Sequence, residues 1–62
     1  MDEKSTNKYG IDYTAFKNLN RFMKEEDAIR TAESICEREH WELDSWHVES
    51  ALNNLDMDMA YN

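Results

Sequence analysis

The amino-acid sequence predicts an all-α fold, in the form of a small three-helix bundle. Apolar residues recur every three or four positions from residue 11 onward, as they do on one face of an α-helix. This pattern changes phase within MKEED at residues 23–27 and is interrupted by the corner-like stretch HWELDSWH at residues 40–47. The alternative is a two-helix hairpin completed by homodimerisation, because a chain of 62 residues buries only about 60% of the surface that its unfolded form exposes.

Length and composition limit the chain to one domain. Residues 1–10 show no apolar pattern, and we expect a flexible N-terminal tail there, followed by a single helical domain at residues 11–62. The single cysteine, Cys36, excludes an intrachain disulfide and favours a reducing compartment, so we expect a cytoplasmic protein. No apolar run approaches the roughly 20 residues that span a bilayer.

The first helix is predicted over residues 12–24. Asp12 can cap its N-terminus, because an aspartate accepts hydrogen bonds from the N–H groups of a first turn. Ile11 and Phe16 flank this cap at the spacing of a hydrophobic staple. Its expected apolar face consists of Ala15, Phe16, Leu19, Phe22 and Met23.

The second helix is predicted from residue 24 or 25 to about residue 41. Glu25, Glu26 and Asp27 would lie in its first turn, where the helix dipole favours negative charge. Its apolar face is out of phase with that of the first helix, which requires a break within MKEED. The expected face consists of Ala28, Ile29, Ala32, Ile35 and Cys36.

The third helix is predicted from residue 45 to near the end of the chain. Asp44 is its candidate N-cap, flanked by Leu43 and Val48 at the same spacing as in the first helix. HWELDSWH then becomes a corner between helices, in which Trp41 closes the second helix. The expected apolar face consists of Val48, Ala51, Leu52, Leu55 and Met59.

The sequence offers little support for a metal site or an enzyme active site. Cys36 and His40 lie four residues apart on a helix, and His47, Asp44 or Glu37 could supply a third ligand. Structural zinc sites, however, use four cysteine or histidine ligands at tight paired spacing. Cys36 also falls within an apolar face, where burial makes a thiol unreactive. We therefore predict no metal site, no cofactor and no enzymatic activity.

The charge is uneven along the chain. Five basic and three acidic residues give +2 in residues 1–24, whereas two basic and eleven acidic residues give −9 in residues 25–62, for a formal net charge of −7. An acidic surface attracts basic proteins and repels nucleic acid and anionic lipid. A weak nucleic-acid interaction remains an alternative through the basic face of the first helix. This face consists of Lys17, Arg21 and Lys24, with Tyr13 beside it.

A second face of the third helix predicts partner binding. Trp46, Met57 and Tyr61 lie nearly opposite its apolar face, and large exposed apolar side chains indicate interaction surfaces. The alternative is that Trp46 folds back onto Trp41 and that Met57 and Tyr61 lie in a frayed end.

We therefore expect a non-enzymatic protein-interaction module that inhibits or regulates a protein with a basic surface. A DNA mimic, whose carboxylates imitate phosphates towards a nucleic-acid-binding protein, is one form of this prediction. The same apolar face could instead join copies into a homo-oligomer. Six carboxylates are expected to steer the partner: Glu33, Glu37, Glu39, Glu42, Glu49 and Asp56.

Overall fold

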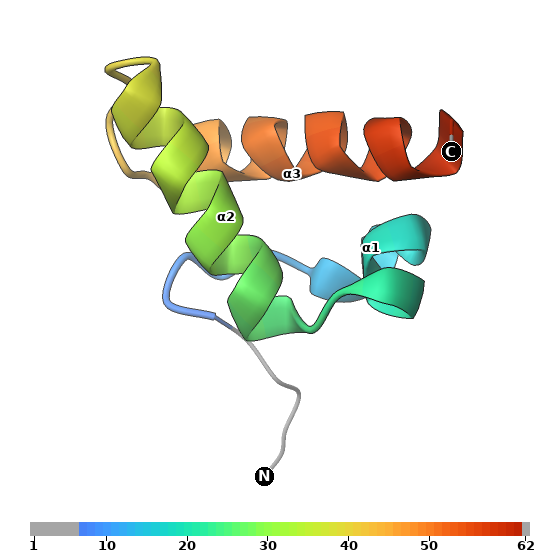
Figure 1. The fold of residues 1–62 in the computed structure, drawn as a ribbon. Helices are drawn as coiled ribbons and strands as arrows, with labels where there is room; N and C mark the ends of the chain where they lie inside the picture. The colour runs from blue at the N-terminus through green and yellow to red at the C-terminus, as the bar shows by residue number, and fades with distance from the viewer. Residues whose placement is uncertain (1–6, 62) are drawn as a thin grey trace, which may run out of the picture.

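The computed structural model describes residues 7–61, without the side chain of Tyr61. It contains a short 3-10 helix, η1 (Tyr13–Ala15), and three α-helices: α1 (Lys17–Phe22), α2 (Glu25–Arg38) and α3 (Ser45–Tyr61). Over these residues the all-α prediction is confirmed. Figure 1 shows α2 and α3 as two arms that meet at the α2–α3 corner, with η1 and α1 in the opening between them.

The first predicted helix is two short helices. The backbone breaks at Phe16 (φ −96°, ψ 85°), so the prediction of one helix over residues 12–24 is wrong. Asp12 caps η1 by accepting the N–H of Thr14 at 3.2 Å. The break rotates the chain so that Tyr13 is buried instead of facing solvent. The Tyr13 hydroxyl donates to the carbonyl of Met23, and burial raises the pKa of Tyr13.

The structure also differs from the prediction in which side chains of this region form the core. Phe16 and Leu19 are buried as predicted, whereas Ala15 and Phe22 are exposed. Leu19 and Phe22 both lie within α1, three residues apart, yet Leu19 is fully buried and Phe22 is 67% exposed. The assignment of Phe22 to the apolar face is therefore corrected.

The predicted break within MKEED is confirmed. Met23 and Lys24 both have extended backbones, and α2 begins at Glu25 with three acidic residues in its first turn. The helix ends at Arg38, before the predicted end at residue 41. It ends there because His40 adopts a left-handed conformation (φ 64°), which an α-helix cannot continue through.

The predicted start of α3 is confirmed. Asp44 accepts the backbone N–H of His47 at 2.9 Å, and the N–H of Val48 reaches the Asp44 carbonyl at 2.9 Å. The bond from the His47 backbone holds the pKa of Asp44 below its usual range. Asp44 is therefore the N-cap.

The core lies where the helices meet. Leu19 from α1, Cys36 from α2, and Val48 and Leu52 from α3 are fully buried. Partly buried side chains, including Ile35, pack around them. The complete buried cluster consists of Ile11, Tyr13, Phe16, Leu19, Ala28, Ile29, Ala32, Cys36, Val48, Ala51 and Leu52. Among the described residues, no helix is both long and apolar enough to cross a bilayer.

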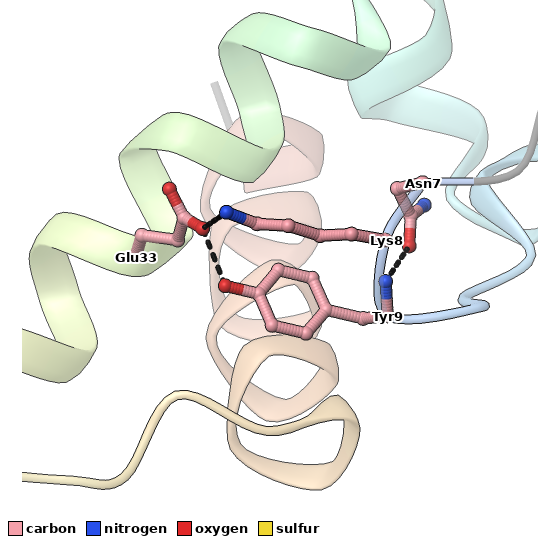
Figure 2. A network of polar contacts seen from close by, with 4 residues as sticks. All are labelled: Asn7, Lys8, Tyr9 and Glu33. Atoms are coloured by element: carbon pink, nitrogen blue, oxygen red, sulfur yellow. Dashed lines mark hydrogen bonds and ion pairs between the residues drawn. The ribbon is translucent and has the colours of Figure 1, made fainter.

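Residues 7–10 pack against α2. The Asn7 amide donates to the Ile11 carbonyl at 3.0 Å and to Glu25 at 2.8 Å. The Tyr9 hydroxyl donates to Glu33, which also pairs with Lys8 at 3.1 Å (Figure 2). These four residues thus belong to the fold, although they were expected in a tail, and residues 1–6 lie outside the described part.

Candidate protein-binding site

The α2–α3 corner carries three exposed apolar side chains and the half-buried ring of a histidine. We call these four residues the aromatic corner: Trp41, Leu43, Trp46 and His47. The His47 ring lies between the two indoles, with centroid distances of 5.7 Å to Trp41 and 5.3 Å to Trp46. Trp46 is 72% exposed, Leu43 45% and Trp41 36%. The structure therefore brings two exposed indoles against the same imidazole, from residues that follow one helix and begin the next.

Local hydrogen bonds hold the aromatic corner in place. The N–H of His40 bonds to the Glu37 carbonyl at 3.2 Å, and the N–H of Trp41 bonds to the Cys36 carbonyl at 2.7 Å. This pair of bonds is the Schellman motif that ends many helices. On the other side of the turn, Asp44 contacts the His47 ring nitrogen Nδ1 at 2.9 Å. A surface fixed in this way loses little conformational entropy when it binds a partner.

The electrostatic setting of the aromatic corner is acidic. Arg38, exposed at the end of α2, is the last lysine or arginine in the sequence, so the residues after it bring only negative formal charge. Three of their carboxylates are exposed around the corner: Glu39, Glu42 and Glu49. Such a rim favours approach by a positively charged surface.

Two of the six predicted partner-binding carboxylates are engaged within the fold. Glu33 accepts the Tyr9 hydroxyl and pairs with Lys8. Asp56 accepts the backbone N–H groups of Asn18 at 2.8 Å and Leu19 at 3.1 Å. The other four are exposed: Glu37, Glu39, Glu42 and Glu49. Of the six, the exposed carboxylates therefore lie at the end of α2, in the turn that follows and near the start of α3.

The three predicted apolar anchors on α3 do not form one patch. Trp46 and Met57 are 72% and 70% exposed, and they lie eleven residues apart, or about 16 Å along the helix. Polar residues, including Ser50 and Asn53, occupy the turns between them. Trp46 instead contacts His47, while the side chain of Tyr61 lies outside the described part of the molecule.

A metal site does not assemble at the corner. Cys36 is fully buried, and this burial raises the pKa of its thiol. Within the described part of the chain, no three His, Cys, Asp or Glu side chains gather in a way that would hold a metal ion. Cys36 acts as a small apolar residue between α2 and α3.

A second exposed surface lies on α1 and on the residue before α2, and we call it the basic end: Lys17, Arg21, Phe22 and Lys24. All four side chains are exposed, Phe22 by 67%. The Arg21 guanidinium lies 5.6 Å from the centroid of the Phe22 ring. Among residues 7–60, the three cations form no ion pair with a carboxylate. The structure thus adds an aromatic ring to the predicted basic face.

The sequence contains some signals for the residues that were missed. Trp41 and Leu43 stand outside the apolar face of either neighbouring helix, which is a reason to expect them at the surface. His47 could be found as the third residue after the Asp44 cap, where side chain and backbone both face the cap. Phe22 carries no such signal, because helical spacing places it near the buried Leu19 on α1.

Comparison with known protein families, curated proteins and solved structures finds no match for this chain. The functional argument therefore rests on the two exposed surfaces that the fold creates, the aromatic corner and the basic end.

Proposed function

We propose that this protein is a non-enzymatic protein-binding module, which docks its aromatic corner on a basic surface of another protein. The observation that carries the proposal is the pair of indoles held against His47, with Trp46 72% exposed. Tryptophan is enriched among the residues that dominate binding energy at interfaces. Bringing it out of water on a partner is favourable by about 25 cal/mol per Å² of apolar surface.

The charge around the corner supports a basic partner. Glu39, Glu42 and Glu49 are exposed there, and a partner's arginine can stack on an indole face while it pairs with a carboxylate. Charge complementarity of this kind mainly accelerates encounter and weakens as salt is added. We therefore expect association to slow at higher ionic strength, while the apolar contact at Trp46 sets the lifetime of the complex.

A module of this size would act by occupying its partner's surface, as an inhibitor or regulator. Nucleic-acid-binding proteins carry basic surfaces of the required kind, so they belong to the partner class that we propose. A cytoplasmic setting is part of the proposal, because the only cysteine is buried and has no intrachain disulfide partner.

The test compares Trp46→Ala with Met57→Ala, which removes an equally exposed side chain three turns away on the same helix. The probe is a synthetic amphipathic peptide with arginine on one face and leucine on the other, titrated by calorimetry. Trp46→Ala should weaken binding about 30-fold, since a tryptophan hot spot contributes about 2 kcal/mol. Met57→Ala should bind like the wild type. Equal losses in both variants would show that the binding face runs along α3 and would overturn the assignment to the corner.

A further inference from the structure

The basic end has the composition of the partner that the aromatic corner requires. It presents three exposed cations and a phenylalanine ring that is 67% exposed. The Arg21 guanidinium lies 5.6 Å from the centroid of this ring. An exposed aromatic ring surrounded by cations is complementary to exposed indoles surrounded by carboxylates.

The two surfaces cannot meet within one chain. Asn18 and Leu19 anchor α1 to Asp56, which lies ten residues after Trp46 and therefore about 15 Å further along α3. Figure 1 shows α1 and the α2–α3 corner at opposite ends of the molecule. A contact between a basic end and an aromatic corner must therefore form between two molecules.

We propose that the basic end of a second copy occupies the aromatic corner, so that the chain associates head to tail. This inference rests on the proposed function, because it uses the same corner and names its occupant. Arg21 of one copy would stack on Trp46 of the next. Lys17 and Lys24 would face the exposed carboxylates of the corner. A symmetric pairing of two α3 helices is less favourable, because α3 carries carboxylates and no lysine or arginine.

Head-to-tail association has a distinct consequence. The interface joins two different surfaces, so an open assembly keeps one corner and one basic end unoccupied and grows with concentration, unlike a symmetric dimer. Only a rotation that closes the assembly into a ring occupies every surface. A basic partner protein competes with the second copy for the same corner. Self-association would therefore cover the corner until a partner protein is present, and partner binding would dissociate the assembly.

The experiment removes one surface at a time. Trp46→Ala disables the corner and leaves the basic end, whereas the double variant Arg21→Ala, Phe22→Ala disables the basic end and leaves the corner. Sedimentation equilibrium at low salt should show a mass that rises with concentration for the wild type and a monomer for each variant alone. An equimolar mixture of the two variants retains one working contact, so it should form a 1:1 heterodimer and nothing larger.

Several outcomes would overturn this inference. A wild type that stays monomeric across the concentration range, a wild-type dimer that persists in the double variant, or a mixture that fails to pair would each do so. Circular dichroism of each variant establishes that the helices are intact, which the exposure of all three side chains leads us to expect. Peptide binding that depends on Trp46 while the wild type is monomeric would reject the self-association alone. Absence of both would reject the proposed function as well.

Discussion

His40 ends α2 in a conformation that usually belongs to glycine. Its φ of 64° lies in the left-handed region, where the β-carbon of an L-residue approaches the following carbonyl oxygen at a cost of about 1–2 kcal/mol. Gly10 has a similar φ of 71° and no β-carbon. The chain thus meets the same backbone requirement twice, once with glycine and once with a strained histidine that directs Trp41 into the aromatic corner.

His40→Gly should stabilise the protein. Relief of the strained φ exceeds the added entropy of glycine in the unfolded chain, so the free energy of unfolding should rise by about 0.5–1 kcal/mol. Urea denaturation followed by circular dichroism measures this change. Gly10→Ala is the matched control and should be destabilising, because it places a β-carbon at a similar left-handed φ of 71°. No atom lies within 4 Å of the added β-carbon, so the backbone strain alone would account for the loss of stability. A loss of stability in His40→Gly would mean that the imidazole makes a contact that outweighs the strain.

At the scale of elements, α1 depends on α3 for its start. A helix of six residues is too short to be stable alone, and its own N-cap residue, Phe16, provides no side-chain acceptor. Asp56 supplies the missing acceptor from α3 by bonding to the N–H groups of Asn18 and Leu19. The first turn of one helix is thus capped by the side of another.

Asp56→Ala should destabilise the protein by about 1 kcal/mol, the usual effect of losing a helix cap. The free energy of unfolding from urea titration measures it. Asp56→Asn keeps an oxygen acceptor of the same reach and should lose less. Glu49→Ala, an exposed carboxylate on the same helix, is the control and should leave stability nearly unchanged. Equal stability of Asp56→Ala and Glu49→Ala would show that the bonds to α1 contribute nothing.

At the scale of the whole molecule, two tyrosines tie the N-terminal part of the chain to the helices. The Tyr9 hydroxyl bonds to Glu33 on α2 (Figure 2), and the Tyr13 hydroxyl bonds to the Met23 carbonyl just before α2. The bond to Glu33 raises the pKa of Tyr9 to about 12 and lowers the pKa of Glu33. The contact of Tyr9 connects segments that helix signals treat as independent, whereas Tyr13 and Met23 were predicted within one helix and meet because the chain breaks at Phe16.

These shifts predict how stability depends on pH. The pKa of Tyr9 is raised above its ordinary value of 10.0, so its contribution is complete below pH 10 and is lost as the pH rises toward 12. Glu33 has the opposite sign: its contribution is present above the ordinary pKa of 4.5 and is lost as the pH falls below its folded value.

Tyr9→Phe should therefore reduce the fall in the free energy of unfolding between pH 10 and pH 12. Urea denaturation at a series of pH values up to 12 measures this change. Some decline should remain, because burial also raises the pKa of Tyr13. The variant Tyr13→Phe measures how much of the decline comes from Tyr13. An alkaline profile identical in wild type and Tyr9→Phe would exclude the bond to Glu33 as a source of stability.

What could be predicted depended on the distance between partners along the chain. The Asp44 cap and the acidic first turn of α2 are confirmed, and both involve residues within one helical turn of each other. The apolar faces of α2 and α3 were predicted for the same reason, because their period is a local property. Of the candidate site, the sequence predicted that Trp46 and the neighbouring carboxylates would matter, but it grouped Trp46 with Met57 instead of with Trp41 and His47.

The sequence by itself determined the all-α class, the break before α2 and the start of α3, because each follows from hydrogen bonds and side-chain spacing inside one segment. Only the tertiary structure decided the break at Phe16, the internal roles of Glu33 and Asp56, and the aromatic corner. The partners of Glu33 and Asp56 lie 24 and 37–38 residues away, and a one-dimensional pattern cannot indicate which distant groups will meet. Those contacts form only when the packed core brings the helices together, and they determine which charges and which aromatic rings remain for a partner.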